Sequence, residues 1–436
     1  MADMKLKKLT SVLILILLIS GCAGLDKSIG QKVSARADDI KDHKSDTNPD
    51  PPVNVHLSWT EDPSTTMTIT WQTKSDSKGF IEYGMKETEL SSGTDTPSSL
   101  KTDYGIIHEV TAAGLHPGTK YYYRCGSNDG GWSEIHTFRT APANGPFSFV
   151  VLGDTQNDRS IRRNIAGAIR DLRPLFIIHC GDMTNTGGSK KLWAEWFEDM
   201  GGLIAEIPIM PVMGNHDNYC VQSNSLCQGM FERFALPDNG IQEASEYWYS
   251  FNVAGMHFIM LNSENDAGIK PGSKQYQWLE NDLENNKAAV WKVAVMHKPP
   301  FSMGFHGDNK DIKENWTPLF DRYGVDMVFS GHEHIYERTK PIKDMNTDAA
   351  GTVYIIAGSG GSWVYGCKGN VPEAKSRFYE KCEGICGFVL ADVGDESINL
   401  SATEVDRGNN TESQSEIIDS FKIEKSYRLP ADPFQE

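Results

Sequence analysis

The feature that most constrains this chain of 436 residues is a series of five apolar runs, each followed by residues able to bind a metal ion. In an open α/β sheet, groups at the carboxyl ends of the strands converge on one crevice. If the runs are strands, one site therefore receives ligands from five separated segments. The runs are 147–152, 175–180, 207–213, 292–296 and 325–329, and the polar residues after them are Asp154, Asp182, Asn215, His297 and His332.

The spacing of residues within these motifs allows two side chains to reach the same metal ion. Side chains two residues apart in an extended segment face the same way, so Asp154 with Gln156, and His332 with His334, can approach one metal together. A carboxylate such as Asp182 can bridge two cations and lower their mutual repulsion, while neutral imidazole and amide groups complete the coordination. Oxygen and nitrogen donors without thiolates favour Mn, Fe, Zn or Co over Cu(I) or iron–sulfur clusters.

Polar residues beside these motifs have other interpretations. We expect His179 to pack inside the sheet, although it lies close to the second motif. Asp217 either polarises His216 or caps a turn, and the sequence leaves both open. We expect Arg338 to pair with Glu337, with a bidentate phosphate contact as the alternative.

The hydrophobic pattern divides the rest of the chain into two kinds of structure. Between Val53 and Pro142, short strand-like runs alternate with clusters of Gly, Pro, Asp and Ser, which predicts a small β-sandwich. Beyond Pro142, large apolar residues recur every three or four positions in 161–172 and 312–323, which predicts helices packed on a sheet. A period-two pattern in 246–261 predicts further strands, and the chain ends in a β-rich part.

The N-terminus has the pattern of an export signal. Three lysines in the first ten residues precede an apolar run, 12–19, that is too short to span a bilayer as a helix. The run ends in Ile19-Ser20-Gly21-Cys22, which looks like a bacterial lipobox, so Cys22 is expected to carry a lipid after cleavage. We therefore expect a lipid-anchored protein on the outer side of a prokaryotic cell membrane, with this lipid as its membrane contact.

Export would place the remaining seven cysteines in an oxidising compartment, where disulfides persist. We expect one bridge between Cys220 and Cys227, and one within a second group in which the pairing stays open. Cys180 lies in an apolar run and reads as a buried thiol. The second group consists of Cys367, Cys382 and Cys386.

The charge balance excludes one class of partner. A formal net charge of −17 would repel a polyphosphate backbone, and no local basic patch stands out in the sequence. We therefore expect a small-molecule partner rather than nucleic acid. The natural substrate and the oligomeric state cannot be read from the sequence.

Taken in order, the motifs resemble the signature of the calcineurin-like metallophosphoesterases, and most closely that of the purple acid phosphatases. They are Gly-Asp, Gly-Asp, Gly-Asn-His-Asp, Met-His and Gly-His-Glu-His-Ile-Tyr-Glu-Arg, and the similarity extends to 115–124, 138–142, 249–251 and 275–280. The resemblance implies a metallophosphoesterase β-sandwich flanked by helices, an α/β (α+β) class, preceded by an all-β fibronectin type III-like sandwich.

The expected organisation follows from this resemblance and from the patterns above. A signal peptide in 1–21 and a flexible tether in 22–52 come first. The fibronectin III-like domain spans 53–142 and the catalytic domain 146–341, and a β-rich part in 342–428 completes the catalytic domain.

The resemblance also assigns residue roles. Asp154, Asp182 and His334 would hold the first metal, and Asp182 would bridge to the second. His216 and His306 match two histidines of the family that face the substrate phosphate. The remaining ligands of the second metal would be Asn215, His297 and His332.

Two departures from the family pattern concern the metals. Asn185 stands where purple members have a tyrosine that binds Fe(III), so this chain should not be purple, and Asn185 is itself a candidate metal or substrate contact. Gln156 stands where that branch has Gly and other metallophosphoesterases have His, so it is a candidate amide ligand. We therefore expect two divalent ions, Fe, Mn or Zn.

The predicted activity is hydrolysis of phosphomonoesters, in which a hydroxide activated by the two cations attacks phosphorus directly. One alternative is a phosphodiesterase that acts on cyclic nucleotides or lipid headgroups with the same metals. Another, from a different class, is a surface binding lipoprotein whose metal core is vestigial.

Overall fold

A computed structural model describes residues 50–75, 78–95, 99–219, 229–241, 246–367, 377–406 and 415–425. The expected signal peptide, Cys22, nearly all of the tether, and the Cys220–Cys227 pair lie outside this part of the chain. Within it, none of the helices combines the length and the apolar character needed to span a membrane.

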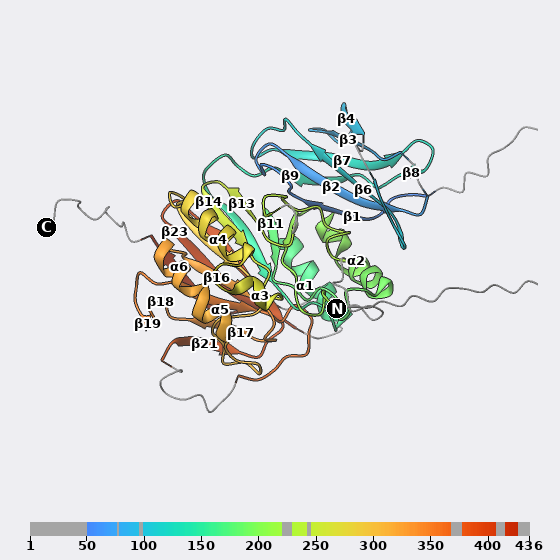
Figure 1. The fold of residues 1–436 in the computed structure, drawn as a ribbon. Helices are drawn as coiled ribbons and strands as arrows, with labels where there is room; N and C mark the ends of the chain where they lie inside the picture. The colour runs from blue at the N-terminus through green and yellow to red at the C-terminus, as the bar shows by residue number, and fades with distance from the viewer. Residues whose placement is uncertain are drawn as a thin grey trace, which may run out of the picture. The chain divides into compact units, whose positions relative to one another are not determined.

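The N-terminal part is the predicted β-sandwich, built from two antiparallel sheets (Figure 1). Its core contains the fully buried side chains Trp59, Trp71 and Tyr123. One sheet has the order β1 (Val53–Ser58), β2 (Met67–Thr73), β6 (Gly105–Ala112), β5 (Ser99–Thr102). The other has the order β4 (Ser92–Asp95), β3 (Phe80–Gly84), β7 (Lys120–Ser127), β8 (Gly131–Trp132), with β9 (His136–Arg139) also paired to β7.

The catalytic part contains two large mixed sheets. The first has the order β12 (Ile209–Pro211), β11 (Phe176–His179), β10 (Phe147–Leu152), β22 (Gly387–Val393), β23 (Ser397–Val405), β24 (Ser415–Glu424). The second has the order β13 (Tyr249–Val253), β14 (Met256–Met260), β15 (Trp291–Val295), β16 (Met327–Ser330), β20 (Val353–Ala357), β17 (Tyr336–Thr339), β21 (Tyr379–Glu383). A small hairpin joins β18 (Ile342–Lys343) to β19 (Asn346–Thr347).

An aromatic core holds the two sheets together. The ring of Phe149 in β10 meets Phe258 in β14 edge-on at a centroid distance of 5.3 Å, and Phe329 in β16 at 6.2 Å. The five runs with polar ends thus belong to two sheets rather than to one open sheet. Within each sheet these strands are parallel, so their carboxyl ends still lie at a common edge.

Helices cover the outer faces of the sheets (Figure 1). The helix α1 begins where the side chain of Asp158 accepts hydrogen bonds from the backbone of Ser160 and Ile161. Apolar side chains of α4 and α6 pack with those of the seven-stranded sheet. The helices are α1 (Arg159–Leu172), α2 (Lys190–Ile204), α3 (Asp266–Ile269), α4 (Lys274–Asn285), α5 (Lys310–Asn315) and α6 (Thr317–Tyr323).

The helical structure expected over 312–323 is present, but it is divided into two helices. Two short helices, α5 and α6, meet at Trp316. Pro318 lies in the first turn of α6, where its missing N–H would have no intrahelical partner, and it favours a new helix start there. Trp316 stays fully buried, which explains why the apolar period continues across the break.

The β-sandwich is joined to the catalytic part by buried contacts. The hydroxyl of Ser58 donates to the carbonyl of Ala235 at 2.6 Å, and that of Tyr123 donates to the carbonyl of Ala205 at 2.7 Å. The Trp59 ring meets Phe176 edge-on. These contacts fix the β-sandwich on the side of β11 and α2.

Candidate metal centre

Three of the predicted ligands lie on strained backbone directly after their strands. Asp154, Asp182 and His332 have φ angles of 56°, 58° and 69°. Residues other than glycine rarely adopt this left-handed conformation, which costs about 1–3 kcal/mol and clusters at functional sites. The surrounding fold therefore holds these turns in place against a local conformational cost.

Two glycines let the loops approach closely enough for the site to form. A Cβ atom at Gly214 would overlap Oδ1 of Asp182, and one at Gly331 would overlap Oδ2 of Asp154. Glycine is therefore needed at both positions, because the neighbouring carboxylates leave no space for a side chain.

Backbone carbonyls orient two of the histidines. Nδ1 of His297 lies 2.7 Å from the carbonyl oxygen of Cys180, which turns Nε2 toward Oδ1 of Asn215 at 3.0 Å and Oδ2 of Asp182 at 3.3 Å. Such a contact fixes which ring nitrogen remains available, and metal-binding histidines usually show it.

His334 has the same arrangement. Its Nδ1 lies 2.8 Å from the carbonyl oxygen of Trp363, and its Nε2 lies 3.5 Å from Oδ1 of Asp154. The ring of His332 completes the group, with Nδ1 at 2.9 Å from Oδ1 of Asn215. Histidines from separate loops thus present nitrogen atoms to the same oxygens.

The structure brings all six of these predicted ligands together. Candidate ligand atoms of Asp154, Asp182 and His297 lie within 4.8 Å of one another, and all three residues are buried. The remaining three join this cluster through the contacts given above. They are Asn215, His332 and His334.

The electrostatics of this cluster favour positive charge. Burial tends to lower the pKa of His297, but the Asp182 and Asp154 carboxylates raise it to about 10. Burial would raise the pKa of Asp182, yet His297 holds it below the usual value of an aspartate. Burial and the charge of His297 lower the pKa of His332 to about 2, which keeps its imidazole in the neutral form that binds metals.

The donor set fits divalent cations. Gln156 is only 6% exposed, and neither its amide oxygen nor its amide nitrogen has a hydrogen-bond partner in the described part of the chain. A buried amide without partners is costly, and ligation of a cation by its oxygen would compensate. Cys180 is buried as predicted and contributes its carbonyl group to His297, so the set consists of oxygen and nitrogen atoms.

Asp217 fastens two of the ligand loops to each other. Its carboxylate accepts hydrogen bonds from the backbone N–H groups of Asp182 at 2.7 Å, Met183 at 3.0 Å and Gly214 at 3.1 Å. The sequence leaves two roles open for Asp217, and the structure supports the one in which its side chain caps a turn. His179 is buried as expected, with Nε2 at 3.0 Å from the Thr155 hydroxyl.

His216 and His306 lie at the edge of the cluster rather than inside it. The backbone N–H of His216 donates to Oδ1 of Asp182 at 2.8 Å, and its Nδ1 lies 3.1 Å from the backbone carbonyl of Asn185. The His306 ring stacks on that of His332 at a centroid distance of 4.4 Å, and its side chain is 42% exposed. The Asn185 residue itself is exposed.

Sequence reasoning missed the residue that holds the His306 loop. Glu333 is fully buried, and its Oε1 accepts from the backbone N–H groups of His306 at 2.6 Å and Gly307 at 2.7 Å. Its position between the two histidines of Gly-His-Glu-His is the signal that was available. The left-handed turn at His332 changes the direction of the chain just before Glu333, whose side chain reaches a different loop from the two histidines.

The expected pair of Arg338 with Glu337 is wrong. Neighbouring residues of a strand point to opposite faces, so the two side chains diverge from β17. Nε of Arg338 donates to Asp419 in β24 at 2.8 Å, whereas Oε2 of Glu337 accepts from the backbone of Met303 at 2.7 Å.

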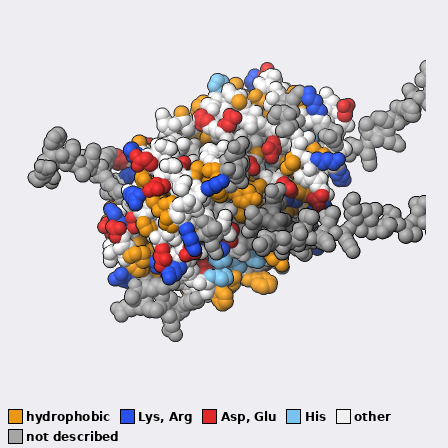
Figure 2. All heavy atoms as spheres, in the orientation of Figure 1, with side chains coloured by type: hydrophobic (Ala, Val, Ile, Leu, Met, Phe, Trp, Pro, Cys, Tyr) orange, Lys and Arg blue, Asp and Glu red, His pale blue; other side chains and the backbone are white. Residues whose placement is uncertain are grey.

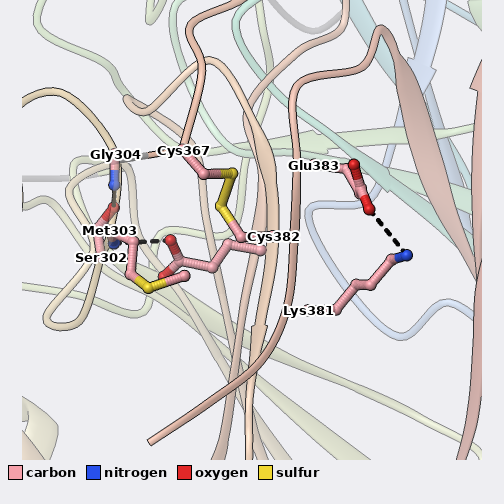
Figure 3. Close-up of a disulfide and its surroundings, with 8 residues drawn as sticks. Ser302, Met303, Gly304, Cys367, Lys381, Cys382 and Glu383 are labelled. Carbon is pink, nitrogen blue, oxygen red and sulfur yellow. Dashed lines mark hydrogen bonds and ion pairs between the residues drawn. A yellow bond between two sulfur atoms is a disulfide. The ribbon is translucent and has the colours of Figure 1, made fainter. Parts of the chain in front are cut away.

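A disulfide joins Cys367 to Cys382, with Cα atoms 6.2 Å apart (Figure 3). It confirms a bridge in the second cysteine group and identifies the pair, while Cys386 lies buried outside it. The bridge ties the segment after Tyr365 to strand β21.

Comparisons with known proteins show the family to which the chain is related. A model of the purple acid phosphatase N-terminal domain matches residues 52–140, and one of the calcineurin-like phosphoesterases matches residues 147–336. Probable purple acid phosphatase 20 of Arabidopsis thaliana is 32% identical over 332 residues, which cover 72% of this chain and 76% of that protein.

Two further relatives extend the comparison. Purple acid phosphatase 15 of Arabidopsis thaliana is 33% identical over 290 residues, 59% of this chain, and the match spans only 54% of that protein. A purple acid phosphatase from seeds of yellow lupin, Lupinus luteus, shares the fold with a TM-score of 0.75 at 21% identity, covering 87% of this chain and 75% of the lupin chain.

Proposed function

This chain belongs to the purple acid phosphatase family, and from that premise we propose that it hydrolyses phosphomonoesters with two divalent metal ions. The observation that carries the proposal is the convergence of Asp154, Asp182 and His297 at the carboxyl ends of strands from two sheets. The calcineurin-like phosphoesterase domain belongs to a class of metal-dependent phosphoester hydrolases. The choice of monoesters, the ligand roles and the identity of the metals are part of the proposal.

The ligands divide between two ions. Asp154 and His334, which contact each other, serve the first ion together with the amide oxygen of Gln156. Asp182 would be shared by the two ions, as the family resemblance implies, and its carboxylate lies within 4.8 Å of candidate ligand atoms of both Asp154 and His297. The second ion takes the group centred on the Asn215 amide oxygen, namely Asn215, His297 and His332.

When bound, the two cations lower the pKa of a water molecule and stabilise negative charge on phosphoryl oxygens. The protein contributes two imidazoles at the edge of the cluster, the half-buried His216 and the exposed His306. His216, held by Asp182 and the Asn185 carbonyl, is placed to hydrogen-bond a phosphate oxygen. His306, stacked on His332 with its loop held by Glu333, is placed to donate a proton to the leaving oxygen.

The metals are divalent in this proposal. Asn185 stands where the resemblance places an Fe(III)-binding tyrosine, and its backbone carbonyl is directed to His216. The metal-loaded protein should therefore lack the visible charge-transfer absorption of an Fe(III)–tyrosinate. An intense band in the visible spectrum of the purified protein would contradict this assignment.

We also propose that the protein acts outside the cell membrane, anchored by a lipid on Cys22. The lysine-rich start and the apolar run before Cys22 support this location. The wild-type protein should partition with detergent, and Cys22→Ser should remain in the aqueous phase. Equal partitioning of the two proteins would rule out the anchor.

The activity is tested by comparing para-nitrophenyl phosphate with bis(para-nitrophenyl) phosphate, using protein loaded with Mn, Fe or Zn. We expect faster turnover of the monoester. Faster turnover of the diester would support the phosphodiesterase alternative, and metal-loaded protein inert to both would support a binding protein. A chiral monoester should react with inversion at phosphorus, because direct attack by water involves one displacement; retention would contradict the mechanism.

A further inference from the structure

Exposed aromatic side chains gather on the loops that carry the histidines of the site. Within the described part of the chain, the three most exposed large hydrophobic side chains are Trp363 at 76%, Phe305 at 67% and Tyr219 at 61%. Other large rings, such as those of Trp59 and Trp71, are fully buried. Aromatic surface left in water beside a reaction centre is typical of a binding site.

Each of these residues is linked to a different histidine of the site. The carbonyl of Trp363 lies 2.8 Å from Nδ1 of His334, and the ring of Phe305 is edge-on to that of His306 at 5.1 Å. On a third loop, the backbone N–H of Tyr219 donates to the carbonyl of His216 at 3.2 Å.

Tyr365 connects two of these loops. Its ring stacks on His334 at a centroid distance of 4.4 Å and an angle of 18°, and lies 5.7 Å from the ring of Phe305. The rings of His306 and Tyr365 are 6.2 Å apart. Figure 2 shows exposed histidine side chains beside hydrophobic ones at the lower edge of the molecule. The rings of Phe305 and Tyr365 therefore lie against histidines of the site, and Trp363 is two residues from Tyr365 on the same loop; we name these three residues the aromatic rim.

The covalent structure restrains the aromatic rim. Cys367, two residues after Tyr365, is bonded to Cys382 in β21 (Figure 3). Cys382 pairs with Glu337 in β17, the strand that begins two residues after His334. A surface restrained in this way loses little conformational entropy when a ligand binds to it.

We infer that the aromatic rim binds a planar aromatic ring in the leaving group of the substrate ester. The inference rests on the proposed function, because His306, the proposed proton donor to the leaving oxygen, lies between His332 and Phe305. A leaving group that departs past His306 meets the exposed rings. Substrates of this class are aryl, arylmethyl and nucleoside phosphates, whose rings stack on aromatic side chains.

The test uses two substrate pairs with similar leaving oxygens that differ in the ring. Adenosine 5′-monophosphate is compared with ribose 5-phosphate, and benzyl phosphate with cyclohexylmethyl phosphate. We expect kcat/KM to be at least about tenfold higher for the aromatic member of each pair, mainly through a lower KM, since each tenfold corresponds to a modest difference in binding. A preference confined to the adenosine pair would mean that the aromatic rim binds a nucleobase. A preference in both pairs would mean that it also binds simple aryl rings.

Variants connect the preference to the rim. Phe305→Ala and Trp363→Ala should each lower the ratio of kcat/KM within a pair at least about threefold through KM, and Trp363→Phe should restore most of it. The ratio cancels any loss that both substrates share, such as a displaced His306. The control is Met85→Ala, which removes an exposed side chain of the β-sandwich and should leave both ratios unchanged.

Two outcomes would overturn the inference in different ways. Equal kcat/KM values within both pairs, or ratios that Phe305→Ala and Trp363→Ala leave unchanged, would overturn it while the phosphomonoesterase proposal stands. Failure of metal-loaded protein to hydrolyse any of the four compounds would overturn the proposed function, and this inference with it.

Discussion

The buried metal ligands of the candidate site, which we call its floor, are held differently from the exposed residues around them, His306 and the aromatic rim, which together we call its rim. The floor residues Asp154, Asp182 and His297 are buried, and the two carboxylates lie on left-handed backbone. The rim residues His306 and Trp363 are exposed; the backbone N–H of His306 donates to Glu333, and the carbonyl of Trp363 lies against Nδ1 of His334. In the proposed mechanism, metal binding therefore depends on buried residues at the edges of two sheets, whereas contact with the substrate depends on exposed residues in the loops around them.

The largest effect should come from removing the carboxylate shared by both ions. Asp182→Ala should lower kcat/KM by at least about a thousandfold, equivalent to about 4 kcal/mol, because neither ion keeps its full set of ligands. Elemental analysis of the purified variant should show loss of metal. A variant that keeps its metal and more than a tenth of the wild-type activity would show that Asp182 is not a shared metal ligand and so does not belong to the floor.

A second prediction concerns the support behind the floor. The fully buried carboxylate of Asp199 accepts from Arg159 and Arg162, and Arg162 also donates to the carbonyl of Thr155, next to Asp154. Asp199→Asn should lower the free energy of unfolding by about 3 kcal/mol at pH 7, because the buried guanidinium of Arg162 loses its charged partner. Chemical denaturation measures this loss.

The pH dependence of that loss follows from the sign of the pKa shift. Burial would raise the pKa of Asp199, but Arg159 and Arg162 bring it below the usual value of 3.8. The stabilisation that the charged Asp199 carboxylate gives to the folded state is therefore present above about pH 4. It is lost as the pH falls through the pKa of Asp199 in the folded state. The control is Arg163→Ala, which removes a half-exposed partner of the same carboxylate and should cost less than about 1 kcal/mol. A difference between Asp199→Asn and wild type that does not shrink in acid would contradict this account.

Glycine substitutions offer a third, sterically matched test. Gly214→Ala should reduce metal content and lower kcat/KM on the order of a hundredfold, since its Cβ would displace Asp182. Gly201→Ala in helix α2 meets no atom within 4 Å and should be neutral or stabilising by up to about 1 kcal/mol. Equal effects of the two substitutions would show that close packing at Gly214 is not what shapes the floor.

The smallest effect is expected at the rim. His306→Ala should lower kcat by at most about a hundredfold, because a general acid is lost while metal content stays at the wild-type level. The exposed His116 of the β-sandwich provides the control, and His116→Ala should leave turnover unchanged. Loss of metal in His306→Ala would place this residue in the floor instead.

The floor could be predicted from the sequence because its signal is local. Each ligand directly follows an apolar run, so Asp154, Asp182 and His297 were identified without knowledge of the strand order. The division into two sheets was not visible, since it depends on distant pairings such as that of β10 with β22. The break at Trp316 was hidden because the buried residue keeps the helical period across it.

The rim was harder to predict for a physical reason. His216 and His306 came from the family resemblance, and the exposed rings of Phe305 and Trp363 follow no period that sequence alone can reveal. The disulfide partner of Cys382 was open because two cysteines lay at compatible spacings, and only the fold brings Cys367 beside β21.

The central claim is that the floor holds two metal ions, and elemental analysis of the purified protein together with its phosphomonoesterase activity tests it most directly. We predict two divalent ions per chain, with activity that is lost on chelation and restored when the metal is returned. Full activity in a protein that contains less than one ion per chain would contradict the account.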